Sequence, residues 1–315
     1  MPAIHSENPY LIDDTGVDYE IDPHKRFTVP APNKGSQPTD GGNLILSPVE
    51  RDELIKKYPQ AEKFIRRYVG AEEFIFNKPR YCLWLVNCSP NEIKAIPPIY
   101  ERIKKVREFR SQSKKQHTKI RAGTPTLFTK INQPTTNFIL IPSVSTSARK
   151  YIPMGFMTPE VIVANTVIII PEATIYLFGV LESSVHMAWM RAVCGRLDHA
   201  YRYSGDIVYN NFIFINADAK RRAKIEATAQ TILDARAKYP DSSLADLYDE
   251  NVMPPELRAA HRANDMAVMD AYGYPKDWYD DERKIVIDLF QRYEAMLNGN
   301  DLSKIAATTR RNIKE

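Results

Sequence analysis

Runs of apolar residues with the length of β-strands recur along the first two thirds of the chain. They cover residues 81–86, 138–145, 166–170, 174–180 and 206–215, and they are rich in β-branched and aromatic side chains. Clusters of turn-forming residues separate most of these runs, and such a pattern predicts buried strands.

The stretch 161–181 is long enough and apolar enough to resemble a membrane-spanning segment. Pro171 and Glu172 stand in its middle, where a helix in a bilayer would need apolar residues. We therefore expect two buried strands joined by a tight turn, and no association with a membrane.

Helices are predicted where a helical period of apolar residues follows a capping residue. Ser47 precedes Pro48 and Glu50, which is the arrangement of a capping box with proline in the first turn. Ser183 and Ser184 give a similar start to a later helix. The helices predicted in this part of the chain span residues 48–57, 59–68, 97–116 and 183–195.

From residue 217 onward the pattern is helical throughout. Three segments, at about 218–238, 254–271 and 280–298, are separated by turns that contain proline. We therefore expect a mixed α/β (α+β) domain followed by a small all-α helical domain. The expected boundaries are 1–47 for an extended leader, 48–217 for the α/β domain and 218–315 for the helical domain.

The composition agrees with a globular protein that folds in a reducing compartment. Of the 315 residues 43% are apolar, enough to fill real cores. The three cysteines include no C-x-x-C pair, which excludes a disulfide scaffold and a zinc ribbon. The first 20 residues contain no apolar run, which excludes a signal peptide. We expect a cytoplasmic protein.

Positive charge is concentrated in the middle of the chain, although the formal net charge is only +4. The ten basic residues of one short segment are Lys94, Arg102, Lys104, Lys105, Arg107, Arg110, Lys114, Lys115, Lys119 and Arg121. Such a field attracts nucleic acid, because each neutralised phosphate releases counterions. A solvated helix face is the other explanation of a charge run.

The signatures of most enzyme classes are missing from the sequence. The 12 glycines form no G-x-G and no G-K-[ST], so the chain has neither a dinucleotide or S-adenosylmethionine fingerprint nor a Walker loop. The six histidines show no zinc-binding spacing, and no serine stands in a G-x-S-x-G turn. The sequence therefore offers no catalytic residue and no metal site for this chain alone.

Two short motifs match catalytic patterns only in part. Asn8-Pro9-Tyr10 lacks the second proline of the N-P-P-[YF] motif with which amino-methyltransferases hold a flipped base. Glu92-Ile93-Lys94 matches half of a nuclease metal site, but the nearest upstream aspartate is the distant Asp52. We interpret both as chance matches, because such short motifs are common.

Two polar segments are stronger candidates for a function. Residues 143–151 follow an apolar run, and residues 195–204 follow the predicted helix 183–195. Loops on a rigid scaffold are the usual place for binding groups. Arginine reads guanine, aspartate accepts from cytosine, and serine and threonine bind phosphate. The same composition also suits a generic polar loop.

Several long motifs carry a resemblance to a known family. They are PTDGGNLILS (38–47), YPQAEKFIRRYVGAEEFI (58–75), RYCLWL (80–85), IPPIYERIKKVREFR (97–110), IPSVSTSARKYIPMGF (141–156), HMAWMRAVCGRLDHAYRYSGDIVYNNF (186–212), ILDARAKYPDSSLADLYD (232–249) and MPPELRAAH (253–261). These motifs resemble the C-terminal half of MmeI-like type IIL (type IIG) restriction–modification DNA methyltransferases. The resemblance covers about residues 35–300.

Members of that family join a nuclease, an adenine-N6 methyltransferase core, a target recognition domain and a helical C-terminal domain. The resemblance places this chain on the last two parts only. It implies a sequence-specific recognition module for double-stranded DNA that lacks the catalytic core. S-adenosylmethionine and Mg²⁺ are then implied only for the missing domains, which would lie upstream or act in trans. It further implies a bacterial protein of the cytoplasm.

The resemblance and the charge pattern indicate two groups of site residues. Family members read bases just after the GRL motif, which here implies Asp198, Ala200 and Arg202, with Asn165 or Thr166 from a neighbouring strand. The expected phosphate contacts are Arg102, Lys104, Lys105, Lys114, Lys115, Ser143, Ser145, Arg149, Lys150 and Arg196. The chain departs from the family at 213–215, where a proline-containing segment usually follows NNF.

Two other functions stay open on the sequence alone. One is an S-adenosylmethionine-dependent DNA methyltransferase with an unrecognised site, against which the missing glycine loop argues. The other is a protein–protein adaptor that docks through the acidic C-terminal domain. Partner binding that is insensitive to salt, without DNA affinity, would favour the adaptor.

Overall fold

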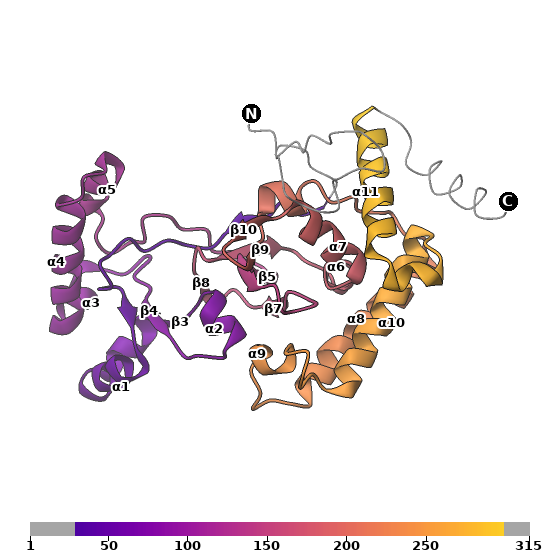
Figure 1. Ribbon diagram of the computed structural model, residues 1–315. Helices are drawn as coiled ribbons and strands as arrows, with labels where there is room; N and C mark the ends of the chain where they lie inside the picture. The colour runs from indigo at the N-terminus through magenta and orange to yellow at the C-terminus, as the bar shows by residue number, and fades with distance from the viewer. Residues whose placement is uncertain (1–28, 299–315) are drawn as a thin grey trace. The chain divides into compact units, whose positions relative to one another are not determined.

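The computed structural model describes residues 29–298, which form two compact units that alternate along the chain (Figure 1). Unit 1 contains residues 29–32, Ser143–Gly155 and, among the described residues, 170–298. Unit 2 contains Asn33–Pro142 and Phe156–Ile169. Most of the expected leader and the Asn8-Pro9-Tyr10 motif lie outside the described residues.

Unit 2 is built on two four-stranded sheets. Its strands are β1 (Asn33–Lys34), β2 (Ile45–Leu46), β3 (Ile65–Val69), β4 (Tyr81–Leu83), β5 (Phe138–Pro142), β7 (Gly155–Met157), β8 (Ile162–Val163) and β9 (Val167–Pro171). The first residue of β7 and the last two residues of β9 are counted in unit 1. One sheet has the order β2-β4-β3-β8, and the other has the order β1-β9-β5-β7. All five residues of β5 are buried, as expected for a strand covered on both faces. Two clusters of buried apolar side chains form the cores of these sheets.

The helices of unit 2 follow their capping residues. They are α1 (Pro48–Lys57), α2 (Ala71–Ile75), α3 (Pro90–Lys94), α4 (Pro97–Ser111) and α5 (Gln116–Ile120). The capping box predicted for α1 is present, because Ser47 N donates to Glu50 Oε2 at 2.8 Å and Glu50 N donates to Ser47 Oγ at 3.2 Å. A second capping box, between Ser89 and Glu92, starts α3. Glu92 therefore caps a helix, which supports the interpretation of 92–94 as a chance match.

Arg110 is fully buried near the end of α4 and fixes the segments around it. Its guanidinium donates five hydrogen bonds of 2.8–3.1 Å, all to backbone carbonyls. The acceptors are Pro38 O, Thr39 O, Arg121 O, Thr124 O and Leu127 O. All five N–H groups of this side chain are satisfied, so one of the ten basic residues is structural.

Unit 1 combines a small sheet with a set of packed helices. Its elements are β6 (Val144–Thr146), α6 (Ile175–Leu181), α7 (Ser184–Val193), β10 (Gly195–Leu197), β11 (Ala200–Arg202), α8 (Ala219–Ala237), α9 (Leu244–Leu247), α10 (Pro255–Tyr272) and α11 (Glu282–Leu297). Helix α8 packs against both α10 and α6, and α11 packs against α7. In Figure 1, α8 and α10 lie side by side in orange.

Close approach of α6 and α8 depends on a glycine. A Cβ on Gly179 would lie 2.8 Å from Ile225 Cγ2 and 2.9 Å from Ala229 Cβ, and Asn264 Nδ2 donates to Gly179 O at 2.7 Å. These contacts are shorter than packed carbon atoms tolerate, so the two helices can meet here only because the side chain is absent.

The fold class expected from the sequence is confirmed, because sheets and helices precede residue 217 and only helices follow it. The three late helices were predicted within two residues of α8, α10 and α11. None of the helices within 29–298 is long and apolar enough to cross a membrane.

Three predicted elements are wrong in type. Residues 174–180 form helix α6 instead of a strand, with Thr174 as its N-cap. Residues 206–215 contain a π-helical turn at Gly205–Tyr209 and no strand. The helix predicted at 59–68 is a 3₁₀ helix, Pro59–Phe64, followed by β3, because residues 65–67 pair with β4.

Three further elements have wrong boundaries. The strand predicted at 81–86 is shorter, since β4 covers only Tyr81–Leu83. The helix predicted at 97–116 ends at Ser111, and residues 112–115 separate α4 from α5. The run 138–145 divides at Ser143 into β5 and β6, which belong to different sheets and different units.

Candidate functional site

A short β-hairpin of unit 1 carries the predicted base-reading residues of the 195–204 segment. Gly195–Leu197 pairs antiparallel with Ala200–Arg202, and the two residues Asp198 and His199 make the turn. Asp198 has φ 50°, the left-handed conformation that such two-residue turns require and that aspartate tolerates. The side chain of Asp198 is exposed at the end of the hairpin.

A third strand, β6, supports the hairpin on the side of β11. Tyr201 pairs with Ser145, so that Ala200 lies opposite Thr146 and Arg202 lies opposite Val144. Because side chains alternate along a strand, Tyr201 and Ser145 share one face of this sheet. That face is directed inward, since Tyr201 is 8% exposed and Ser145 is 2% exposed.

The other face of the sheet is open. It carries Arg202 and Ala200 from β11, Val144 and Thr146 from β6, and Gly195 and Leu197 from β10. Arg202 is exposed and forms no ion pair within residues 29–298. Leu197 and Val144 are also exposed, although both are large apolar residues. The hairpin is thus a short, twisted ribbon that presents one guanidinium among apolar groups.

Arg196 lies on the opposite side of the hairpin from Arg202. Its guanidinium carbon stands 4.3 Å from the centre of the Tyr201 ring, a cation–π contact. Arg196 is exposed and pairs with Tyr201 across the strands. The two arginines of the hairpin are therefore in different settings, one stacked on an aromatic ring and one extending from the open face.

The segment after β6 is bonded to the helices of unit 1. Tyr151 Oη donates to Asp265 Oδ2 at 2.6 Å. Lys150 Nζ donates to Tyr279 Oη at 3.3 Å, and Arg191 Nη1 donates to Lys150 O at 2.9 Å. We call these contacts of Lys150 and Tyr151 the β6 anchor. The anchor fixes the end of the segment that carries the supporting strand.

Asp265 is buried at the centre of the β6 anchor. Its second oxygen, Oδ1, accepts from Ser184 N at 2.7 Å, at the first residue of α7. Burial raises the pKa of Asp265 to about 6, although the bonds from Tyr151 and Ser184 act in the opposite direction. The ring of His261 stacks on Tyr151 at 4.1 Å, and burial lowers the pKa of this histidine well below its ordinary value.

A second buried histidine supports the residue that follows β11. His186 Nε2 lies 2.9 Å from Tyr203 Oη, and Tyr203 N donates to Ser143 O at 2.9 Å. Burial lowers the pKa of His186 to about 3, so the ring is neutral near pH 7. His186 is a packed residue of α7, and it connects this helix to the residue that follows the hairpin.

Of the phosphate contacts predicted in unit 2, Arg102 is held within the protein. It is ion-paired with Glu50 and donates to Asn43 O and Ile45 O, both at 3.3 Å. Lys104 is exposed and is paired with Glu101 at 2.5 Å on the surface of α4. Lys105, Lys114 and Lys115 are exposed and form no ion pair among the described residues. The three unpaired lysines are therefore the most accessible of this group.

The predicted serines and the neighbouring-strand residues lie in different settings. The hydroxyl oxygens of Ser143 and Ser145 are buried and have no hydrogen-bond partner among the described residues. Arg149 is partly buried. Asn165 and Thr166 are exposed between β8 and β9 of unit 2, where Thr166 Oγ1 accepts from Ala71 N at 3.2 Å. Asn165 and Thr166 thus belong to a different compact unit from the hairpin.

Four residues of the open face were not named as site residues from the sequence, namely Val144, Thr146, Gly195 and Leu197. The sequence signal for Leu197 is its place in the GRL motif, one residue before the turn. No local signal exists for the two β6 residues, because only the pairing of β6 with β11 brings them to this face.

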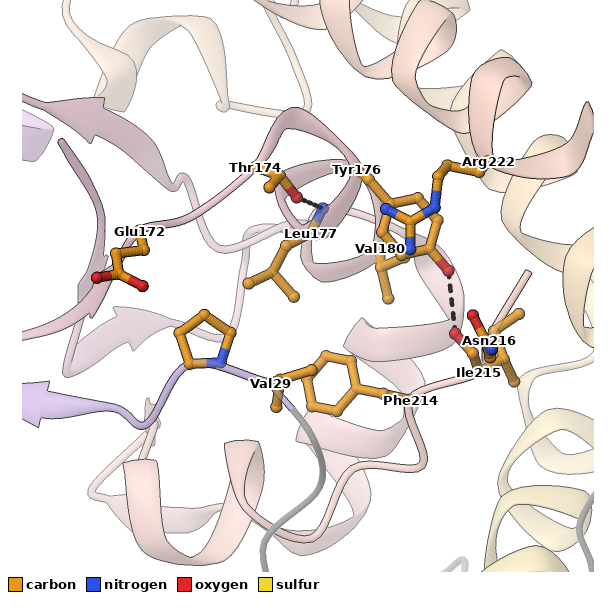
Figure 2. A pocket seen from close by; sticks show the side chains of 11 residues that line it. Val29, Glu172, Thr174, Tyr176, Leu177, Val180, Phe214, Ile215, Asn216 and Arg222 are labelled. Atoms are coloured by element: carbon orange, nitrogen blue, oxygen red, sulfur yellow. Dashed lines mark hydrogen bonds between the residues drawn. The ribbon is translucent and has the colours of Figure 1, made fainter. Parts of the chain in front are cut away.

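A pocket of about 520 Å³ opens in unit 1 near the start of α6 (Figure 2). Tyr176 Oη donates to Ile215 O at 3.1 Å, and the guanidinium of Arg222 stacks 4.1 Å from the centre of the Tyr176 ring. Thr174 and Glu172 line the same pocket, with Thr174 capping α6. The pocket lining contains no histidine and no cysteine among residues 29–298. In the same range no group of three or more His, Cys, Asp or Glu residues is placed to hold a metal ion.

Comparison with known proteins gives consistent matches over nearly the whole chain. A family model described as the MmeI target recognition domain matches residues 17–216, and one described as the MmeI C-terminal domain matches residues 217–299. DNA methyltransferase A of Bacillus subtilis (strain 168) is 36% identical over 285 residues, which are 90% of this chain and 32% of that protein.

A solved structure is also similar. It is that of the type IIL restriction–modification enzyme MmeI in complex with DNA, with 41% identity and a TM-score of 0.87. The match covers 90% of this chain and 38% of that one. The chain thus spans about a third of the length of the two proteins that it matches.

Proposed function

Because the chain belongs to the MmeI family, as a target recognition domain joined to a C-terminal domain, we propose that it reads a specific sequence in double-stranded DNA. The proposal concerns binding and orientation of the DNA, and it assigns no catalytic residue to this chain.

The observation that carries the proposal is the open face of the sheet β10-β11-β6. A two-stranded ribbon fits the major groove, where an arginine can donate two hydrogen bonds to guanine O6 and N7. Arg202 stands on this face, exposed and without an ion pair within residues 29–298. Asp198 at the turn can accept from cytosine N4, and Ala200 can contact a thymine methyl group.

Contacts with the phosphates of the DNA backbone would position the hairpin on the duplex without reading its sequence. Lys105, Lys114 and Lys115 of unit 2 and Arg196 of the hairpin are exposed cations suited to phosphate. Lys104 can exchange its surface ion pair for a phosphate at little cost, because such pairs contribute little to stability. Ser143, Ser145 and Arg102 are weaker candidates, since the first two have buried hydroxyls and the third is held by Glu50.

The whole enzymes of the family are about three times longer than the matched part. We propose that methyltransferase and nuclease domains, upstream or in trans, perform any chemistry on the DNA that this chain selects. S-adenosylmethionine and Mg²⁺ would then be bound by those domains. A bacterial cytoplasmic location, where such DNA is found, is part of the same proposal.

The test is selection of bound duplexes from a randomised DNA pool at two salt concentrations, followed by sequencing. An enriched motif whose binding weakens steeply with salt is the expected result. Salt-sensitive binding without enrichment would overturn sequence reading by this chain on its own and would assign discrimination to its joint action with a methyltransferase partner. Absence of DNA binding at low salt would overturn the proposal and favour the adaptor function.

One test variant and one control variant show whether the selected motif depends on the open face. Arg202→Ala is expected to lose the preference at one base pair of the enriched motif, whereas Arg258→Ala, an exposed arginine of α10, is expected to keep the whole motif. Calorimetry with S-adenosylmethionine addresses the remaining enzymatic alternative, and binding of this cofactor to the chain alone would support it.

A further inference from the structure

The open face of the sheet β10-β11-β6 is arranged in two rows that differ in chemistry. One row runs across the three strands through Val144, Arg202 and Gly195. The other runs through Thr146, Ala200 and Leu197. The first row contains the one charged group of the face, the guanidinium of Arg202. In the second row every side chain presents methyl groups, and Thr146 carries a hydroxyl beside its methyl.

The second row is exposed although it is mostly apolar. Leu197 is 52% exposed, and its register partner Ala200 is only partly buried. Side chains directly opposite each other in an antiparallel pair have Cβ atoms roughly 5 Å apart. The three members of the row therefore form one continuous apolar surface across the sheet, and Val144, 37% exposed, extends it beside Arg202.

We propose that the row Thr146–Ala200–Leu197 recognises the 5-methyl group of a thymine in the major groove. This inference rests on the proposed function, since it requires the open face to enter the groove. The thymine methyl is the one apolar group that base pairs present there, and alanine and threonine methyl groups are its usual partners. Leu197 and Thr146 are then specificity-determining residues in addition to Arg202.

The positions of Ala200 and Arg202 on β11 also set the distance between the thymine contact and the guanine contact. Ala200 and Arg202 are two residues apart on β11, which is roughly 7 Å along the strand. This distance is close to two steps of a DNA strand, at about 3.4 Å each. The thymine is therefore expected within about two base pairs of the guanine that Arg202 reads.

The experiment replaces single thymines by deoxyuridine in the duplex selected by the full chain. Uracil keeps every hydrogen-bonding group of thymine and lacks only the methyl. Binding is expected to weaken about fourfold at one thymine, which corresponds to ~0.8 kcal/mol for one buried methyl-sized group. The other thymines are expected to tolerate the replacement.

Protein variants then identify the side chains that contact this methyl. Leu197→Ala should reduce the thymine-to-uracil affinity ratio at that position toward one, and Thr146→Ser, which removes a single methyl, should reduce it in part. Val252→Ala, an apolar residue of unit 1 that is 66% exposed, is the matched control and should leave the ratio unchanged. Arg202→Ala should weaken binding while the ratio persists.

Three outcomes would overturn the inference. They are a selected motif without thymine near the guanine, equal binding to thymine and uracil at every position, and a ratio that Leu197→Ala and Thr146→Ser both leave unchanged. Each of these is compatible with sequence-specific binding, so each separates this inference from the proposed function. Failure to select any motif would remove both.

Discussion

The hydroxyl group of Tyr151 donates to Oδ2 of Asp265 at 2.6 Å, although the two residues are 114 positions apart. Tyr151 follows the strand β6 that supports the hairpin, and Asp265 lies in the interior of α10. This single bond therefore connects the sheet with the open face to the helical part of the same unit.

Tyr151→Phe is expected to lower the free energy of unfolding by about 1.5–3 kcal/mol, because a buried carboxylate loses a donor that nothing replaces. Denaturation in urea, followed by the intrinsic fluorescence of the tryptophans, measures this. Tyr239→Phe is the matched control, since it removes a similar hydroxyl–carboxylate bond, to Glu256, near the surface. Equal effects of the two changes would contradict the assigned role of Tyr151.

Arg202→Ala is expected to remove the preference for one base pair and to weaken binding to the selected site by about 1–3 kcal/mol. Binding to unrelated duplexes should change little, because phosphate contacts provide most of that affinity. Competition between the selected duplex and a scrambled one measures both quantities. An unchanged preference would exclude Arg202 from base reading.

The double change Lys104→Ala with Lys105→Ala should weaken binding to every duplex alike. The slope of log affinity against log salt should become shallower by roughly two, since each lost phosphate contact contributes about 0.9. Lys56→Ala with Lys57→Ala, at the end of α1, removes the same charge from another helix of unit 2 and should have a smaller effect. Selective loss on one sequence would argue against phosphate contacts.

His186→Gln is expected to flatten the acid dependence of stability. The pKa of His186 is about 3 in the folded protein, below its ordinary 6.5, so the unfolded chain takes up a proton that the folded protein refuses. This group therefore reduces stability as the pH falls from about 6.5 toward 3, by ~1.4 kcal/mol per pH unit. Unfolding in urea at several pH values tests this, because glutamine can still bond Tyr203 without titrating.

Asp265 contributes a slope of the opposite sign. Its raised pKa lets the folded protein hold a proton longer than the unfolded chain, so its contribution falls as the pH rises from about 4 to about 6. Both the parent protein and His186→Gln retain Asp265, and the difference between them isolates the histidine. A slope unaffected by His186→Gln would mean that this histidine is protonated when folded.

Gly179→Ala should destabilise unit 1 by about 1–3 kcal/mol, because its new methyl group would overlap Ile225 and Ala229 of α8. Helix propensity alone predicts the opposite sign, a gain of up to about 1 kcal/mol. Gly123→Ala is the control, since no heavy atom lies within 4 Å of the added Cβ. Thermal unfolding of both variants decides between packing and propensity.

The sequence predicts those elements whose signals are local. The start of α1 and that of α7 can be predicted from Ser47 and Ser183. Their side chains cap the first turn of each helix, and this bond does not depend on what the helix packs against. Helices α8, α10 and α11 are predictable because their apolar residues recur with a helical period and proline-containing turns separate them. Helix α6 also has a capping residue, Thr174, but six of its seven residues are buried, so its apolar run suits a strand equally well.

The surface positions of the candidate site residues could be predicted from the sequence only in part. Resemblance to a family implies positions 198, 200 and 202, and the hairpin presents Asp198 and Arg202 at the surface as that implication requires. Composition alone suggests Ser143 and Ser145 as phosphate contacts, but the pairing of β6 turns the hydroxyl of Ser145 inward. The same pairing brings Val144 and Thr146 outward. Strand pairing between distant segments cannot be read from either segment alone.

The alternation of the two compact units along the chain also limits how recombination between related genes can exchange parts of the protein. The chain passes between the units after residues 32, 142, 155 and 169, so a crossover between related genes at most positions would join parts of one unit from two parents. The hairpin at 195–202 is an exception, because it lies within one uninterrupted stretch of unit 1. A short exchange limited to its codons replaces Asp198, Ala200 and Arg202 together, and Tyr201 is the one buried apolar residue that it also replaces. Under the proposed function, new sequence preferences can therefore arise by small substitutions in the hairpin, whereas exchange of a whole unit requires several simultaneous crossovers.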